Sequence, residues 1–169
     1  NFGGEFPEDY NKILNLKGVG VYTAAAITSF AFDMPYAVVD GNVIRVLSRV
    51  FGVSLPYDLS AGKKEFQYLA QKLLIEKNAA IYNQAIMEFG AIQCKPKSPD
   101  CSICPMQDFC VAYITNSVSE LPFKSKKIKI KDRFLHYLMI EQEHNIFLGK
   151  RKSGIWIGLY EFPFLEFLN

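Results

Sequence analysis

The stretch Leu16-Lys17-Gly18-Val19-Gly20-Val21-Tyr22-Thr23-Ala24 decides the fold of this chain. Two glycines one residue apart indicate a tight turn, and the flanking segments 8–15 and 21–32 are predicted to be helices. A helix that begins directly after such a turn presents unpaired backbone N–H groups, which can hold a phosphate without a charged side chain. An ordinary tight turn between two helices explains the glycines as well, so the stretch alone leaves both interpretations open.

Three further segments repeat apolar side chains at helical spacing, namely residues 42–51, 61–75 and 79–91. Asn78 is the expected N-cap of the last of them. Hydrophobic residues make up 50% of the 169-residue chain and charged residues 21%, which permits a sizeable core and argues against wholesale disorder. We therefore predict an all-helical bundle over residues 1–92.

The four cysteines gather in one short segment. Cys94, Cys101, Cys104 and Cys110 are separated by six, two and five residues. A tight cluster without a secretory signal favours a metal site over disulfides, and over buried free cysteines gathered by chance. Four thiolates suit a zinc ion or a cubane iron–sulfur cluster. A zinc ribbon usually has two Cys-x-x-Cys pairs, and this segment has one.

A single carboxylate, Asp40, follows the apolar run 37–39 and precedes the predicted helix 42–51. The residue types alone favour a helix cap by Asp40 or Asn42, because caps are common and catalytic aspartates are rare. Arg45 and Arg49 fall together on a face of this helix other than its apolar one.

The last part of the chain changes character. Six basic residues occupy ten positions, at Lys124, Lys126, Lys127, Lys129, Lys131 and Arg133. Residues 115–132 are expected to form a linker, either a solvated connector or one that contacts phosphates. Residues 134–140 and 146–148 are predicted to be strands around a polar turn, and 151–163 a loop-rich β segment. An isolated hairpin is marginal in water, so residues 133–169 are expected to begin a second domain.

Four motifs together resemble one family. Leu16–Gly20 resembles the hairpin of the helix–hairpin–helix DNA repair glycosylases, and Val39–Val43 resembles the catalytic aspartate motif of the MutY family of adenine-specific DNA glycosylases. The cysteine spacing is similar to the 4Fe–4S loop shared by the endonuclease III and MutY families, here residues 93–114. Arg151–Pro163 resembles the start of the MutT-like C-terminal domain of the MutY family, where endonuclease III enzymes have no such domain.

The resemblance implies a mainly α fold: a helix–hairpin–helix glycosylase bundle with an iron–sulfur loop, followed by the first strands of a truncated MutT-like α/β domain. It implies double-stranded DNA as the partner, with adenine opposite 8-oxoguanine or guanine, and a protein that is monomeric at full length. Gly18, Val19 and Gly20 would bind the DNA backbone, in keeping with phosphate contacts that position rather than specify. The four cysteines would hold a 4Fe–4S cluster.

The implied reaction is hydrolysis of the N-glycosidic bond of the mispaired adenine. Asp40 would be the catalytic carboxylate, because an ionised carboxylate stabilises the positive charge that builds on the sugar or forms a bond to it. Asn42 would support it, with a cap role still open. Tyr22 occupies the place where the glycosylase–lyases resembling endonuclease III have a Schiff-base lysine, and it has no amine, which favours a monofunctional enzyme. Packing of Tyr22 on the hairpin is an equally good interpretation.

Three alternatives stay open: an endonuclease III-like glycosylase–lyase for damaged pyrimidines, a non-catalytic DNA-binding module, and a zinc-bound structural domain. No glutamate of the chain matches the family's general-acid motif, so we expect this chain alone to be inactive. The net charge of +2 is too small to indicate nucleic-acid binding by itself. No apolar run reaches membrane-spanning length, and the family suggests a bacterial cytoplasmic protein associated with the nucleoid.

Overall fold

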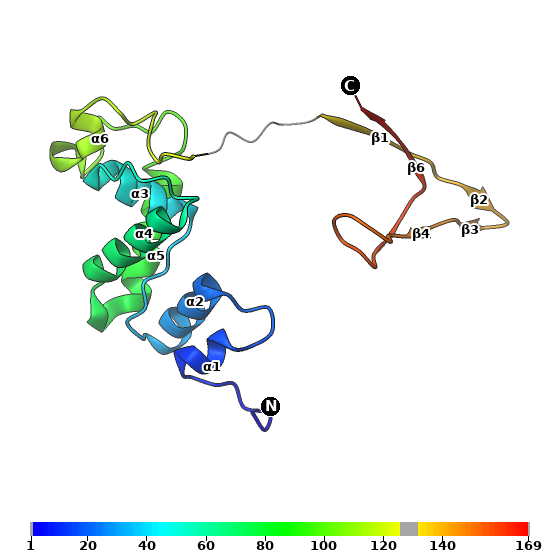
Figure 1. Ribbon diagram of the computed structural model, residues 1–169, viewed down its shortest axis with the longest axis horizontal. Coiled ribbons are helices and arrows are strands. Elements are labelled where there is room, and N and C mark those ends of the chain that lie inside the picture. Colours follow the sequence, from blue (N-terminus) through cyan, green and yellow to red (C-terminus); the bar gives the residue numbers. More distant parts are fainter. Residues whose placement is uncertain (1, 126–131, 169) are drawn as a thin grey trace. The chain divides into compact units, whose positions relative to one another are not determined.

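The computed structural model describes residues 2–125 and 132–168. The chain forms two compact units, one from residue 1 to 127 and one from 128 to 169 (Figure 1). The basic residues Lys126, Lys127, Lys129 and Lys131 of the expected linker lie outside the described residues. No described helix is long and apolar enough to cross a membrane.

The first unit begins with the two helices that flank the glycine turn, α1 (Tyr10–Leu14) and α2 (Val21–Phe32). Asp9 starts α1 because its side chain accepts a hydrogen bond from the Lys12 amide at 3.0 Å. This cap makes α1 shorter than the predicted segment 8–15. The second helix has the predicted bounds, since the extended backbone of Gly20 and the left-handed Asp33 fix its two ends.

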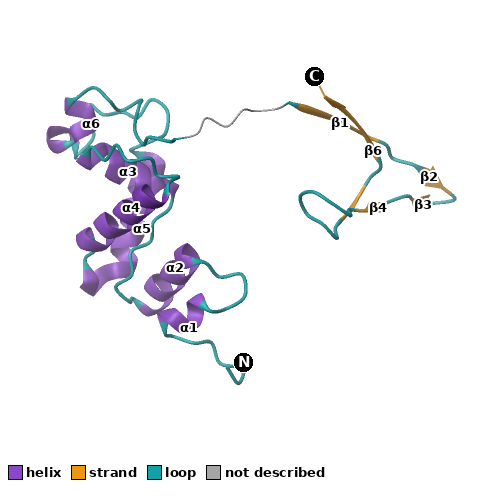
Figure 2. Cartoon of the chain, viewed as in Figure 1, coloured by secondary structure: helices purple, strands orange, loops and turns teal. Residues whose placement is uncertain are grey.

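Three further helices follow and enclose the core (Figure 2): α3 (Gly41–Phe51), α4 (Ser60–Leu73) and α5 (Ala79–Ile92). The short 3₁₀ turn η1 (Glu76–Asn78) precedes α5. Helix α3 lies in the middle and packs against both α4 and α5. Its residues Val43 and Leu47 form the buried cluster together with Ala37, Phe66 and Ala70. Burial of such side chains supplies most of the stability of the unit.

Asn78 lies at the N-cap position of α5 as expected, but it does not cap the helix with its side chain. Asp33, at the end of α2, instead accepts a hydrogen bond from the Ala80 amide at 2.9 Å. The cap is therefore supplied from another helix, which ties α2 to α5 and is invisible to a rule based on neighbours in sequence.

The cysteine segment folds back onto α3 through the 3₁₀ turn η2 (Gln107–Phe109) and the short helix α6 (Val111–Ile114). Farther along, the carbonyl of Phe123 accepts a hydrogen bond from the Tyr57 amide at 3.1 Å. Residues 115–125, the expected start of the linker, thus contact the helical unit.

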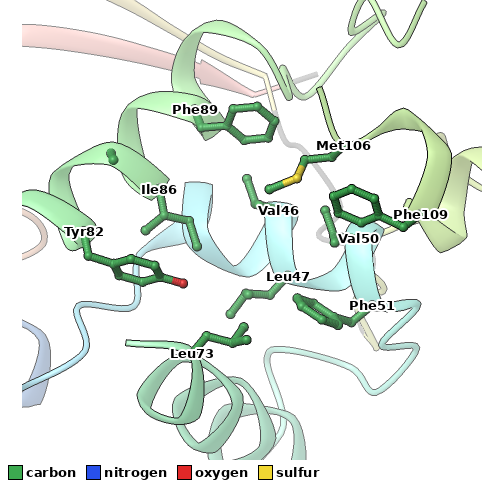
Figure 3. Close-up of a pocket in the computed structure, with 11 residues that line it drawn as sticks. Val46, Leu47, Val50, Phe51, Leu73, Tyr82, Ile86, Phe89, Met106 and Phe109 are labelled. Carbon is green, nitrogen blue, oxygen red and sulfur yellow. The ribbon is translucent and has the colours of Figure 1, made fainter. Parts of the chain in front are cut away.

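An apolar cavity of about 370 Å³ lies between α3, α4, α5 and the cysteine segment. Figure 3 shows side chains from these elements directed toward one space, among them Leu47, Ile86, Phe89 and Met106. Burial raises the pKa of the Tyr82 hydroxyl at its edge. Such a lining offers little to a phosphate or a nucleobase, so we assign this cavity to packing.

The second unit consists of three two-stranded antiparallel ladders. Its strands are β1 (Arg133–Tyr137), β2 (Glu141–Gln142), β3 (Asn145–Ile146), β4 (Gly149–Lys150), β5 (Tyr160–Glu161) and β6 (Phe164–Leu168).

The predicted strands 134–140 and 146–148 meet only near the turn, where the Phe147 amide donates to the Ile140 carbonyl at 3.0 Å. Strand β1 pairs with β6 over five positions, and only the short β2–β3 ladder spans the polar turn. The β1–β6 register is favoured by an aromatic contact between Tyr137 and Phe164 and by an ion pair between Arg133 and Glu166. The loop-rich β character of residues 151–163 is as predicted.

Candidate active site and cluster loop

The glycine turn presents an open backbone surface. Gly18 has a φ of +85°, which glycine adopts without strain, and a side chain at Gly18 or Gly20 would meet no atom within 4 Å. No side chain among the described residues caps the start of α2. The first N–H groups of this twelve-residue helix therefore face outward unpaired, in the arrangement that binds a phosphate.

The carboxylate of Asp40 is held at both oxygens. Oδ1 accepts a hydrogen bond from the Val43 amide at 2.8 Å, which makes Asp40 the N-cap of α3. Oδ2 accepts a second hydrogen bond from Nδ2 of Asn42 at 2.9 Å. Asn42 itself lies inside α3 and is not a cap. The helix cap accounts for the hydrogen bond at Oδ1 of Asp40, and Asn42 holds Oδ2.

Arg45 joins this pair to the cysteine segment. Its Nη2 donates to Oδ1 of Asn42 at 2.8 Å and to the carbonyl of Gly90 at 2.7 Å, and its Nε donates to the carbonyl of Cys94 at 2.8 Å. The residue is 8% exposed. Burial lowers the pKa of the guanidinium, whereas the neighbouring Cys94 raises it. A continuous line of hydrogen bonds thus runs from Asp40 to the first cysteine.

Arg49, one helical turn farther along α3, holds the segment that carries the cysteines. It is 3% exposed and donates to the carbonyls of Leu121, Lys95 and Pro96 at 3.0, 2.7 and 3.1 Å. Its Nη1 also lies 3.4 Å from Sγ of Cys94. One buried guanidinium therefore donates to carbonyls inside the cysteine loop and to a carbonyl after it, so these acceptors are hydrogen-bonded.

The four cysteines line one small cavity between α3, the end of α5 and the cysteine loop. They are only partly buried, and burial raises the pKa of the Cys101 thiol, with the neighbouring Cys104, Cys94 and Cys110 adding to the effect. As placed here, no group of three or more metal-ligating side chains in the described part of the chain could hold a single metal ion. Four thiols around a shared cavity nevertheless provide the donor set of an iron–sulfur cluster.

Tyr22 stands at the start of α2 and is 46% exposed. It lines a cavity together with Val39, the residue before Asp40. In the described part of the chain no hydrogen bond joins the Tyr22 hydroxyl to Asp40. The fold therefore brings Tyr22 to the neighbourhood of the carboxylate without a direct contact.

The sequence did not reveal the part played by Arg45 and Arg49. Their spacing placed them on one face of a helix, but their partners are carbonyls between 45 and 72 residues away, apart from the local bonds of Arg45. The sequence does hold one signal of this role: two arginines lie four residues apart on a helix whose other residues are mostly apolar. When such a helix is buried on several faces, its charged side chains need hydrogen-bond partners.

Comparison with known proteins agrees with this architecture. Residues 94–110 match a family model described as the iron–sulfur binding domain of endonuclease III. The solved structure of a thermostable thymine-DNA glycosylase is 37% identical, with a TM-score of 0.63 over 68% of this chain and 52% of that one. A non-covalent endonuclease III–DNA complex is 31% identical, with a TM-score of 0.56 over 67% and 51%. The fold and the cysteine loop are similar to those of the helix–hairpin–helix DNA glycosylases, which confirms the predicted fold.

Within that class the matches are more specific. The adenine DNA glycosylase of Buchnera aphidicola subsp. Baizongia pistaciae is 36% identical over 96% of this chain, and other adenine DNA glycosylases match at 31–46% identity. The chain spans less than half the length of these relatives, 46% for the Buchnera protein. The chain is thus a homologue of the adenine DNA glycosylases, which confirms the resemblance to that family.

Proposed function

We propose that the protein acts in DNA base excision repair as an adenine DNA glycosylase, and that it hydrolyses the N-glycosidic bond of adenine mispaired with 8-oxoguanine or guanine. The observation that carries the proposal is the Asp40 carboxylate, fixed at both oxygens, in a fold that also has an open hairpin suited to a DNA phosphate. The adenine DNA glycosylases among its homologues support the choice of base.

The hairpin and the carboxylate have separate tasks in this reaction. The backbone N–H groups that follow Gly18, Val19 and Gly20 bind a phosphate of the strand and set its position, while the target nucleotide is turned out of the stack. As the bond to adenine lengthens, positive charge develops on the sugar. Asp40 stabilises that charge, either through space or by a bond to the sugar that water later breaks.

Asn42 and Tyr22 serve the carboxylate in different ways. Asn42 donates to Oδ2 of Asp40 and so fixes the plane of the carboxylate. Tyr22 borders the same region and carries no amine, so this position cannot form a Schiff base with the sugar. Water therefore completes the reaction, and the strand is not cleaved by the enzyme.

The cysteine loop completes the proposal. Cys94, Cys101, Cys104 and Cys110 would hold a 4Fe–4S cluster, supported by their shared cavity. The cluster would supply a rigid anchor for a loop that has little core of its own. The loop would in turn present two exposed residues, Lys95 and Lys97, to DNA phosphates.

The test is single-turnover base release by the full-length protein that contains this chain, on a panel of duplexes with adenine opposite 8-oxoguanine, guanine or thymine, and with an oxidised pyrimidine opposite guanine. We expect release from the first two and no borohydride-trapped adduct. Release of the oxidised pyrimidine with a trapped adduct would establish the endonuclease III-like alternative. DNA binding without any release would establish the non-catalytic module.

A further inference from the structure

The cavity lined by Tyr22 and Val39 has a volume of about 450 Å³ and includes Val21, the residue that follows the glycine hairpin. Tyr22 from the start of α2 forms one wall, and Ile44 of α3 and Phe66 of α4 form the apolar floor. Since Phe66 is fully buried beneath it, the floor is part of the rigid core. The cavity is therefore a fixed feature of the helical unit.

Two cations stand at this cavity, Lys63 from the first turn of α4 and Lys124 from the segment after the cysteine loop. Both side chains are exposed. In the described part of the chain the ion pairs join Arg133 to Glu166 and Arg151 to Glu161, so neither lysine forms one. Two unpaired ammonium groups from distant parts of the sequence thus meet at one opening.

The fold holds Lys124 in place from both sides. The preceding residue, Phe123, accepts a hydrogen bond from the Tyr57 amide at 3.1 Å. The following residue, Ser125, donates from its amide and its hydroxyl to the two carboxylate oxygens of Asp58, at 2.9 and 2.7 Å. Asp58 also lines the cavity, but both of its oxygens accept bonds from Ser125. Lys124 therefore lies at the cavity on a segment whose two neighbouring residues are hydrogen-bonded to the helical unit.

We propose that this cavity is a second contact for the DNA backbone, in which Lys63 and Lys124 bind phosphates of the strand held by the hairpin and a deoxyribose packs on the apolar floor. The proposal rests on the proposed function, which makes DNA the partner. Ammonium groups bind phosphates as point charges, and an apolar floor with a tyrosine wall suits a sugar ring. The adjoining hairpin delivers the neighbouring phosphate of the same strand.

Its test is the salt dependence of binding to a duplex with an abasic-site analogue opposite 8-oxoguanine, measured with the full chain carrying its cluster. Each lost phosphate contact lowers the slope of log affinity against log salt by about 0.9. The double variant Lys63→Ala/Lys124→Ala should therefore lower the slope by about 1.8. The matched control Lys64→Ala/Lys72→Ala removes two exposed lysines of α4 that do not line the cavity, and should leave the slope nearly unchanged.

Two further measurements separate the possible outcomes. Lys63→Arg/Lys124→Arg should restore the wild-type slope, and the control pair Lys64→Ala/Lys72→Ala should release adenine at the wild-type rate. An unchanged slope in the alanine pair, or an equal drop in the control pair, overturns the proposed contact while adenine release still upholds the function. A wild-type protein that binds no DNA would overturn the function itself.

Discussion

Gly90 of α5 is the residue at which a single methyl group should disturb the candidate active site. A Cβ at residue 90 would lie 2.7 Å from Cβ of Asn42 and 3.0 Å from its carbonyl oxygen. Ordinary contact begins at 3.4 Å, so Gly90→Ala must separate α3 from α5 by at least about 0.7 Å. The atoms that must yield belong to the backbone and Cβ of a buried helix, so no side-chain rotation relieves the contact.

The displaced residue is the one that orients the carboxylate. Asn42 donates to Asp40 and accepts from Arg45, so a shift of Asn42 also moves Asp40. A misplacement of about 1 Å at a reacting group costs up to about 100-fold in rate, and we expect Gly90→Ala to slow adenine release by about 10- to 100-fold. Overpacking costs about 1–3 kcal/mol, of which the better helix propensity of alanine returns about 0.5–1 kcal/mol.

The assay is single-turnover adenine release by the full-length protein that contains this chain, with urea unfolding of the same preparation. Ala91→Ser adds one atom to the exposed neighbouring position of α5 and should keep the wild-type rate. A Gly90→Ala protein that is folded and releases adenine at the wild-type rate would refute the reasoning, because the contact would then not position Asp40.

Three other substitutions test the packing and the cluster loop. Arg49→Met leaves the carbonyls of Lys95 and Leu121 without their donor. The cost is about 1–3 kcal/mol for each carbonyl that water cannot reach. The iron content per chain should fall, and full iron content would contradict the role of Arg49. Gly62→Ala places a Cβ 2.0 Å from the Pro56 carbonyl oxygen, so thermal unfolding should shift down by the equivalent of at least about 1–3 kcal/mol, and an unchanged Tm would show that the α3–α4 connection yields. Leu47→Ala removes a side chain that is 1% exposed and should cost about 2–5 kcal/mol in urea unfolding, while the release rate of the folded protein is retained.

Local patterns in the sequence predicted the helices well. The bounds of α2 follow from Gly20 and its alanine-rich run, and α3 and α5 lie within one residue of their predicted ranges. Apolar periodicity sets these elements because each packs one face on the core. Where a boundary depends on a distant partner, as with Asp33 at the start of α5, the pattern names the wrong residue.

The strands and the buried cations show the same limit. Strand β1 pairs with β6, which lies about 30 residues farther along the chain. The polar turn that follows β1 gives no sign of this distant partner. The motifs indicated Asp40 and the cysteines, but the hydrogen-bond partners of Arg45 come from α5 and Cys94. Such partners become neighbours only when the helices pack, so no spacing rule contains them.

The central claim is that Asp40 performs chemistry and is more than a helix cap. Asp40→Asn separates the two roles, because asparagine caps a helix about as well as aspartate but carries no charge to stabilise the sugar. The decisive measurement is single-turnover adenine release from a duplex with adenine opposite 8-oxoguanine, with urea unfolding in parallel. We predict that Asp40→Asn keeps the cap bond from Val43 and loses the bond from Asn42, at a cost of about 0.5–1.5 kcal/mol, and that it loses release by at least about 100-fold. Release at the wild-type rate by the folded variant would contradict the account and leave Asp40 as a cap.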